Sequence, residues 1–570
     1  MGILTKTLID GLNHTQLIDN TRDNAQMVYG LDDDIDKTLS LAMTLMRIIA
    51  HYSECDNPEG GMWVTPKRSE TGVLLLSARN VQNGFLSFHK VDYVPTEVYE
   101  SLTKRLKINS GDVLMSCSGT VGRSCVAPSS LEFALVRSVA VLKPLFGMGE
   151  FLSYSIRSPQ LQRQINEKKS QTAQANIFQG KIKQLLFAVP PLAEQHRIVN
   201  KIEELFTQLD AGVDLLKKLK VKLKRYRQAV LKAVVEGKLT QAWRAAHQDE
   251  LEPASVLLDR ILKERREKWK ADQLAKMETK GKVPKDDKWK LKYKEPAAPN
   301  APDWLENLPK EWTLATVGQI AVLVQYGSSS KTNLDSSGIP VLRMGNIVEG
   351  KLVFDKLKYL PKDHKEFPEL LLEPYDVLFN RTNSVELVGK TSVYEGRPSV
   401  CSFASYLIRV RIHTTLEPSF VSHYINSIYG RKWIGSVVSQ QVGQANVNGT
   451  KLQALSIPLP PKQEQEEIFD RVEYLFSIIE ELEKIIDKNF RRAEKLRQSI
   501  LKKAFEGKLV PQDPNDEPAS VLLERIQAEK AQQEAKSKKR KTTAKKKKSR
   551  KPTKTKQLEI TDDSNEDQAS

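Results

Sequence analysis

Few residues of this chain have the types and spacing that chemistry requires. Residues 386–391 (Glu-Leu-Val-Gly-Lys-Thr) resemble the end of a phosphate-binding loop. That motif needs a glycine five residues before Gly389, and this position is Ser384, so a turn beside a strand is the favoured interpretation. The motifs GxSxG and HExxH are absent, and the eight histidines show no metal-ligand spacing. The sequence therefore predicts no catalytic residue, no metal site and no cofactor bound by this chain.

The composition is that of an ordinary globular protein with an excess of positive charge. The 570 residues are 40% hydrophobic and 28% charged, with a formal net charge of +17. Residues 536–556 carry thirteen Lys and Arg and no acid, which favours association with a polyanion. Four cysteines in 570 residues exclude a disulfide scaffold and fit a reducing cytoplasm, and the absence of a CxxC pair argues against a structural zinc site. The best candidate for a membrane span, residues 39–50, is too short, so no membrane contact is expected.

The chain contains a tandem duplication. Ordered matches recur at offsets that drift only between 264 and 270 residues. Matched pairs include Asn80 and Asn346, Asp112 and Asp376, Gln174-Ala-Asn176 and Gln444-Ala-Asn446, Pro190-Pro191 and Pro460-Pro461, and Gly237-Lys-Leu239 and Gly507-Lys-Leu509. Chance does not produce so many matches in the same order.

Each copy combines short Val, Ile and Leu runs, broken by turn residues, with one long helix. The runs predict a mixed α/β domain, so the fold class is α/β (mixed α+β) with two globular domains alternating with two long helices. The predicted order is an atypical helical N-terminal extension (1–60), a first α/β domain (61–190), a first helical segment (191–262), a charged and proline-rich linker (263–305), a second α/β domain (306–459), a second helical segment (460–530) and a disordered basic tail (531–570).

Apolar residues at steps of three and four mark each long helix, with a proline pair before it and Gly237 or Gly507 after it. A helix of about 45 residues spans roughly 65 Å and cannot bury such a stripe alone. We expect the two helices to pair as an antiparallel intramolecular coiled coil with pseudo-two-fold symmetry, although packing of one side on a partner stays open. The expected core residues are Leu205, Leu209, Leu216, Leu475, Ile479 and Leu482.

Two short motifs recur at the boundaries of these segments, and a third occurs once. Pro-Pro-x-x-Glu-Gln opens each helix (190–195 and 460–465), Glu-Gly-Lys-Leu closes it (236–239 and 506–509), and Leu-Pro-Lys-Glu-Trp (308–312) opens the second α/β domain. In this order the motifs resemble the specificity subunits of type I restriction-modification systems, over roughly residues 61–262 and 304–526. The first α/β domain departs from the pattern, since it lacks the Leu-Pro-x-x-Trp opening and offers only Trp63 as a remnant.

The resemblance implies a function for the whole chain. Each α/β domain would be a target recognition domain for one half of a bipartite site in double-stranded DNA, and the helices would set the gap between the halves. The helices would also dock two modification (methyltransferase) subunits and the restriction (translocase and nuclease) subunits. Chemistry with S-adenosylmethionine, ATP and Mg²⁺ would belong to those partners, and the prokaryotic cytoplasm would be the location. A coiled-coil scaffold without sequence-specific DNA binding is the alternative.

Side chains that could reach DNA follow from matched positions in the two copies. Base edges are read by Arg, Asn and Gln, while Lys and Arg position phosphates. The candidates are Arg79, Arg123, Arg343, Arg381, Asn383, Lys390, Gln174 and Gln444. Asn176 and Asn446 occur in both copies and are interpreted as caps or turn formers, because shared residues are poor readers of different half-sites.

Overall fold

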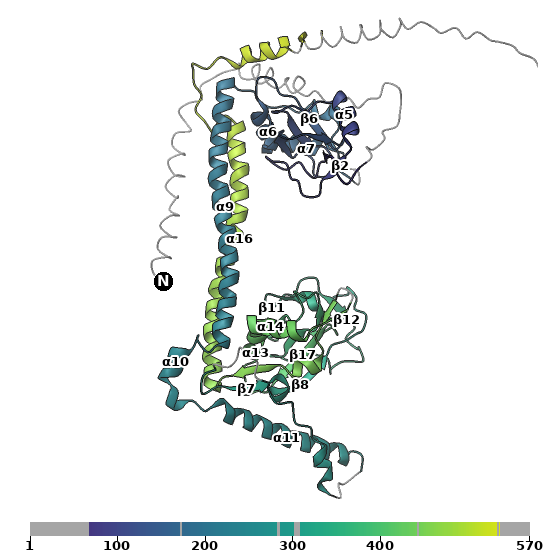
Figure 1. Ribbon diagram of the computed structural model, residues 1–570, viewed down its shortest axis with the longest axis vertical. Helices are drawn as coiled ribbons and strands as arrows, with labels where there is room; N and C mark the ends of the chain where they lie inside the picture. The colour runs from purple at the N-terminus through teal and green to yellow at the C-terminus, as the bar shows by residue number, and fades with distance from the viewer. Residues whose placement is uncertain are drawn as a thin grey trace, which may run out of the picture. The chain divides into compact units, whose positions relative to one another are not determined.

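The computed structural model describes residues 68–529 except 171–173, 282–285, 301–307 and 442–443, together with 531–532 and 535. The predicted N-terminal extension and nearly all of the predicted basic tail lie outside the described residues. The chain forms two compact units (Figure 1). Unit 1 consists of residues 1–213 and 491–570, and unit 2 of residues 214–490. Both therefore contain part of each long helix.

The α/β domain of unit 1 is built on two three-stranded sheets, ordered β2-β1-β5 and β4-β3-β6. The central strand β3 is buried at all four positions, because its run Val-Leu-Met-Ser packs on both faces. The strands are β1 (Val73–Leu76), β2 (Asp92–Val94), β3 (Val113–Ser116), β4 (Ser124–Val126), β5 (Phe133–Leu135) and β6 (Val139–Leu142). The helices are α5 (Thr96–Arg105), α6 (Gly149–Arg157), α7 (Pro159–Lys168) and α8 (Gln179–Ile182).

The α/β domain of unit 2 repeats this plan with more strands. A four-stranded antiparallel sheet, ordered β15-β13-β17-β8, holds its core, and three-stranded sheets β12-β9-β16 and β14-β19-β18 adjoin it. The strands are β7 (Thr313–Thr316), β8 (Ala321–Tyr326), β9 (Ile339–Leu342), β10 (Ile347–Val348), β11 (Lys351–Leu352), β12 (Lys358–Leu360), β13 (Val377–Asn380), β14 (Thr382–Asn383), β15 (Thr391–Val393), β16 (Ser402–Phe403), β17 (Leu407–Ile412), β18 (Ser439–Gln441), β19 (Gln444–Asn446) and β20 (Ser456–Leu459). The helices are α10 (Gln241–Ala246), α11 (Ala254–Glu278), α12 (Val317–Ile320), α13 (Pro418–Asn426), α14 (Ile428–Val437) and α15 (Gly449–Gln453), with 3-10 turns η1 (Gln248–Glu250), η2 (Asp287–Lys292) and η4 (Met344–Asn346).

The two long helices, α9 (Leu192–Val235) and α16 (Lys462–Phe505), have 44 residues each. They begin just after the proline pairs, and Gly237 and Gly507 follow their ends with φ of 64° and 69°, the left-handed conformation expected of a glycine after a helix. Neither they nor any other helix in the described part of the chain is apolar enough over a sufficient length to cross a membrane.

Each unit buries apolar residues of both long helices in one cluster. In unit 1 these are Ile198, Ile202 and Phe206 of α9 with Leu501 and Ala504 of α16. In unit 2 they are Leu223, Val230 and Val234 of α9 with Ile468, Val472, Phe476, Ile479 and Ile486 of α16. Of the expected core residues, Ile479 is buried, Leu209, Leu216 and Leu475 pack partly buried against these clusters, and Leu205 is half-buried.

Leu482 differs from the expectation, because 38% of its surface is exposed. Ile479 and Ile486 are consecutive buried residues of the apolar stripe of α16. Between them, Glu483 forms an ion pair with Arg227 of α9 at 3.4 Å. The polar pair thus occupies the seam where a leucine was expected. The sequence pattern also missed Phe206 and Phe476, which are buried one position after the predicted Leu205 and Leu475.

The predicted linker is wrong in its first half. Helix α11 runs from Ala254 to Glu278 across the expected boundary at residue 263. Its first turns are buried in the core of unit 2 through Ala254, Leu257 and Ile261. The charged residues that follow were interpreted as a linker, yet Lys, Arg and Glu are strong helix formers and carry the helix onward.

Candidate nucleic-acid interface

In unit 2 the loop after β13 meets the strand that contains the matched Gln-Ala-Asn sequence. Strand β14 (Thr382–Asn383) pairs antiparallel with β19, so that Thr382 lies opposite Asn446 and Asn383 opposite Ala445. The side-chain amide of Asn446 donates to Thr382 Oγ1 at 2.7 Å. The structure therefore brings Arg381, Asn383 and Gln444 together at one edge of the domain, as their candidate role requires.

Arg381 lies on an aromatic support. Its guanidinium stacks over the ring of Tyr326, 4.7 Å from the centroid, and its Nη1 donates weakly to the Ser405 carbonyl at 3.4 Å. The Tyr326 hydroxyl accepts from the Gly449 amide at 2.7 Å, which fixes the ring. The side chain remains half-buried, so a stacked and pre-oriented guanidinium stands at the loop. No sequence motif pointed to Tyr326.

Unit 1 contains the same crossing of chains with smaller side chains. Ser118 forms a bridge with Asn176, and the Gly119 amide donates to the Ala175 carbonyl at 2.9 Å. The strand register places buried Cys117 at the position of Arg381, and Gly119 at that of Asn383. Gln174 is exposed beside this crossing. The backbone scaffold is shared by the two units, whereas the side chains that it presents differ.

Asn176 and Asn446 do not have the expected role of caps. Both lie in strand pairings, where Asn446 donates to Thr382 and Asn176 donates to the Gln174 carbonyl at 2.9 Å. The cap is Asn448, whose side chain accepts from the Lys451 amide at 2.8 Å at the start of α15. Asn176 and Asn446 thus occur in both copies because each lies in the strand crossing of its unit.

Arg123 and Lys390 lie beside the same crossing in their units. Each follows a glycine with positive φ, Gly122 (90°) and Gly389 (82°). The Asn380 amide donates to the Lys390 carbonyl at 2.9 Å, directly before Arg381 in the chain. A side chain on Gly389 would overlap Ile434, with 2.1 Å to its Cδ1, so this turn is closely packed. Both basic side chains are half-buried and adjoin the candidate reading loops, residues 117–119 in unit 1 and 381–383 in unit 2.

Arg79 and Arg343 are not structural counterparts, contrary to the sequence comparison. The matched residues Asn80 and Asn346 each accept from a backbone amide three residues earlier, and these amides belong to Ser77 and Arg343. Arg343 therefore corresponds to Ser77. Arg79 is paired with Asp92 at 2.9 Å, and Arg343 Nη2 donates to the Lys356 carbonyl at 3.0 Å. Local contacts occupy both side chains.

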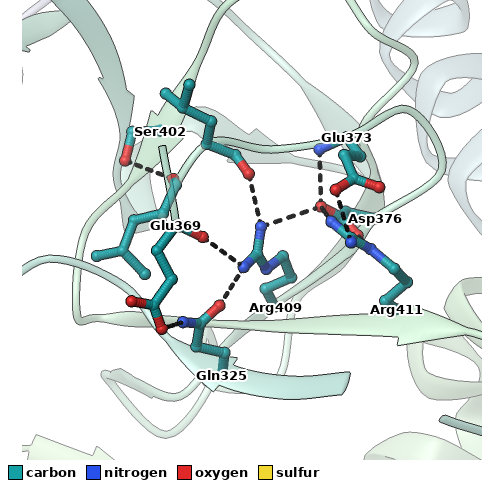
Figure 2. Close-up of polar contacts among 9 residues, drawn as sticks. Gln325, Glu369, Glu373, Asp376, Ser402, Arg409 and Arg411 are labelled. Carbon is teal, nitrogen blue, oxygen red and sulfur yellow. Dashed lines mark hydrogen bonds and ion pairs between the residues drawn. The ribbon is translucent and has the colours of Figure 1, made fainter. Parts of the chain in front are cut away.

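A buried polar cluster of unit 2 around Asp376 and Arg409 has the arrangement of a structural support (Figure 2). Asp376 is fully buried and accepts from Arg411 Nε at 2.8 Å and from the Glu373 amide at 2.9 Å. Arg409 donates to the carbonyls of Leu371 and Glu369 at 2.6 and 2.9 Å. Burial lowers the pKa of Arg409, and the hydrogen bond to Asp376 raises the pKa of Arg411.

Backbone groups and opposite charges thus satisfy most polar atoms of this cluster, and Arg409 Nε is buried without a hydrogen-bond partner. Unit 1 repeats it in simpler form, with Asp112 accepting from Lys143 and the Asn109 amide, both at 2.7 Å. Its recurrence in two domains with different loops indicates a role in holding the strands. In the described part of the chain, no group of three or more His, Cys, Asp or Glu side chains could hold a metal ion.

The three boundary motifs converge on one buried carboxylate, Glu464 of Pro-Pro-x-x-Glu-Gln. Trp312 of the Leu-Pro-Lys-Glu-Trp motif donates its indole N–H to Glu464 Oε2 at 2.7 Å. Thr240, which follows Glu-Gly-Lys-Leu, donates to Oε1 at 2.6 Å, and the Arg244 guanidinium also donates to Oε1. Glu464 has no exposed surface. The motifs are therefore parts of one junction, the Glu464 junction, that joins the domain of unit 2 to both long helices.

Comparison with known proteins agrees with this arrangement. The sequence model of the family described as "Type I restriction modification DNA specificity domain" matches residues 70–225 and 309–488. These segments cover more than half of the chain, which therefore belongs to this family. They contain both strand crossings and the Trp312–Glu464 pair.

Named relatives share most of their length with this chain. The type I restriction enzyme StySPI specificity subunit of Salmonella potsdam is 26% identical over 472 residues, covering 80% of this chain and 88% of the relative. The EcoKI specificity subunit of Escherichia coli K12 is 26% identical over 473 residues, with the same coverage. A structure solved in a study of complex assembly and conformational transition of the type I R-M system has a similar fold, with a TM-score of 0.51, 17% identity, and coverage of 78% of this chain and 96% of that one.

Proposed function

We propose that this protein is the DNA specificity subunit of a type I restriction-modification complex and is not itself an enzyme. Family membership and the relatives' names support this role. One observation supports the recognition of a DNA site made of two half-sites. The same strand crossing occurs in both units but carries different side chains, Arg381 and Asn383 in unit 2 and Cys117 and Gly119 in unit 1. Two equal scaffolds with unequal reading groups suit two different half-sites.

The finer organisation belongs to the same proposal. Units 1 and 2 each contain one target recognition domain, within the residue ranges expected from the sequence. Helices α9 and α16 pair along their length as an antiparallel coiled coil and set the number of base pairs between the half-sites. The ion pair of Lys220 with Asp487 at 2.8 Å in unit 2, and the contact of Arg497 with Asp210 in unit 1, support this pairing.

Assembly with other subunits follows from the family. Two modification subunits and the restriction subunits would dock on the helices and bring S-adenosylmethionine, ATP and Mg²⁺ with their chemistry. The relatives come from prokaryotes, and we place this protein in a prokaryotic cytoplasm. A scaffold that binds proteins but not DNA is the competing function, and it has no use for differing reading loops.

The test is a methylation map. The chain is expressed with its modification subunit in a host that lacks DNA methylation, and modified adenines are located by long-read sequencing. We expect one split motif, two short half-sites with a fixed gap. Co-purification of both subunits without any modified motif would contradict the specificity role and favour the scaffold.

A further inference from the structure

Unit 2 carries a basic projection that the recognition domains do not explain. We call residues 263–281 and 286–294 the arm; they form the outer part of α11 and the turn η2 (Figure 1). The arm contains eleven Lys and Arg against six Asp and Glu. It lies between the two family matches, which end at residue 225 and resume at 309. Its charge therefore belongs to neither recognition domain.

The arm is rigidly attached and internally folded. At its root, Ile261 is buried in the core of unit 2, and Arg265 donates to the Ala321 carbonyl at the start of β8. Further out, Trp269 of α11 stacks on Trp289 of η2 with ring centroids 6.1 Å apart. Tyr293 lies edge-on to Trp269 at 5.3 Å. Trp289 has 92% of its surface buried, which is unusual for a residue of a flexible linker.

The acidic residues of the arm are largely occupied, and many lysines are not. Glu267 pairs with Lys270 at 2.8 Å, and Asp287 with Lys290 at 2.6 Å. Glu264 lies 3.1 Å from His413 of the domain. Six exposed lysines have no ion pair within the part of the chain that the structure describes: Lys263, Lys268, Lys276, Lys280, Lys292 and Lys294. The arm thus presents unneutralised positive charge on a fixed frame.

The position of the arm on the domain favours DNA as the partner. Strand β8 connects the two sites, since Arg265 binds the chain at Ala321 and Tyr326, at the other end, supports Arg381. Five residue steps of a strand span about 17 Å. The lysines lie beyond this root, with Lys276 eleven helix residues or about 16 Å past Arg265. A duplex carries one negative charge per ~1.7 Å of its axis, so a duplex that continues past the reading loop offers phosphates over the whole of this range.

We propose that the arm binds the sugar-phosphate backbone of the duplex flanking the second half-site, without reading its sequence. The inference rests on the proposed function, because the reading loop places the duplex. The lysines would displace counterions condensed on the DNA. The stacked rings of Trp269, Trp289 and Tyr293 would hold the lysines in position before binding. The arm thus adds affinity and leaves sequence discrimination to the loops.

The test uses the full chain in complex with its modification subunit and duplexes that carry the mapped target. One duplex ends about two base pairs beyond the second half-site, and another extends a full turn further; a third extends only beyond the first half-site. The arm variant is Lys268→Gln, Lys276→Gln and Lys292→Gln. The matched control is Lys331→Gln, Lys362→Gln and Lys365→Gln, which removes the same charge from exposed loop positions of unit 2 outside the arm and the long helices. Binding is measured by fluorescence anisotropy over a salt series.

We expect the extension beyond the second half-site to tighten wild-type binding roughly tenfold, and the arm variant to lose this gain while it binds the short duplex normally. Its salt dependence on the extended duplex should be less steep by up to about three counterions. The control should retain the gain. Equal loss on the short duplex, or no loss on any, overturns the inference; loss of modification-subunit binding instead would assign the arm to a protein.

The two proposals fail separately. A wild-type complex that prefers its target over a scrambled duplex, yet gains nothing from the extension, contradicts the arm alone. A complex that does not discriminate the target contradicts the proposed function, and with it the placement of the duplex on which the arm inference depends.

Discussion

Replacing Glu464 with glutamine should destabilise unit 2 more than any surface change on α16. The carboxylate accepts hydrogen bonds from Thr240, Arg244 and Trp312, and it is completely buried. A glutamine of the same shape keeps one oxygen but turns an amide toward one of these donors. It also leaves the guanidinium of Arg244, only 12% exposed, without its closest counter-charge.

The magnitude follows from these contacts. A hydrogen bond to a charged group contributes about 1.5–3 kcal/mol, and breaking a buried ion pair costs about 3–5 kcal/mol. Glu311, 3.9 Å from Arg244, compensates in part, so we expect about 3 kcal/mol for Glu464→Gln. Trp312→Phe removes a single bond from the same carboxylate and should cost about 2 kcal/mol. Together the two should cost less than their sum, because both remove the same bond.

The assay must resolve the two units, because a chain of two compact units need not unfold in one step. Hydrogen exchange of the full chain, followed by mass spectrometry, reports each unit separately. Glu481→Gln is the matched control on the same helix, because Glu481 is 67% exposed and forms a single exposed ion pair, with Lys484 at 3.6 Å. This substitution should lower the free energy of unfolding by less than about 0.5 kcal/mol. If Glu464→Gln changes the protection of unit 2 no more than this control, the convergence of the motifs on Glu464 has no energetic meaning.

Three further predictions concern single side chains. Arg381→Ala should relax the choice of base at one position of the second half-site by roughly 10–100-fold while the first half-site stays unchanged, which the methylation map reports; a change in both halves would contradict the assignment. Phe206→Leu should lower the stability of unit 1 by about 2 kcal/mol, because Arg497 and Arg157 stack on its ring at 4.9 and 5.7 Å; hydrogen exchange in unit 2 should not change. Burial lowers the pKa of His423 to about 4, so the fold prefers the neutral imidazole. That preference stabilises fully above about pH 6.5 and is lost as pH falls toward 4, by about 3 kcal/mol in all, and His423→Phe should abolish this part of the acid sensitivity of unit 2.

The long helices were predictable because their signals are local. Proline pairs, a first-turn glutamate and the closing glycines define both ends, and the apolar stripe defines the middle. The fine assignment within the stripe was not predictable. Phe206 and Phe476 are buried because each stacks with an arginine of the opposing helix, Arg497 or Arg227, and such a pair exists only after the helices have met.

The candidate site was predictable in part. The matched Gln-Ala-Asn sequences and the Arg381 loop were identified from the duplication, and strand pairing brings them together. Tyr326 was missed because it is distant in sequence and belongs to no motif. The arm was mistaken for a linker, because its high charge hides two tryptophans that only the folded chain stacks on one another.

The duplication separates residues that fold the chain from residues that can read DNA. At two pairs of polar residues shared by both copies, the structure gives the side chain the same internal partner twice. Asn80 and Asn346 each close a turn, and Gln195 and Gln465 each donate to the first proline carbonyl of their motif, at 2.8 and 2.9 Å. A residue that satisfies its own backbone is not available to a base edge.

Specificity must therefore lie where the copies differ on a shared scaffold. The loop after β3 and β13 meets this condition, since the same strand crossing carries a buried cysteine in one unit and a stacked arginine in the other. The same argument demotes Gln174 and Gln444, which occupy identical positions, and favours Arg381 and Asn383. For a duplicated binding protein, disagreement between the repeats is thus the stronger sign of recognition, and agreement is the sign of the frame that positions it.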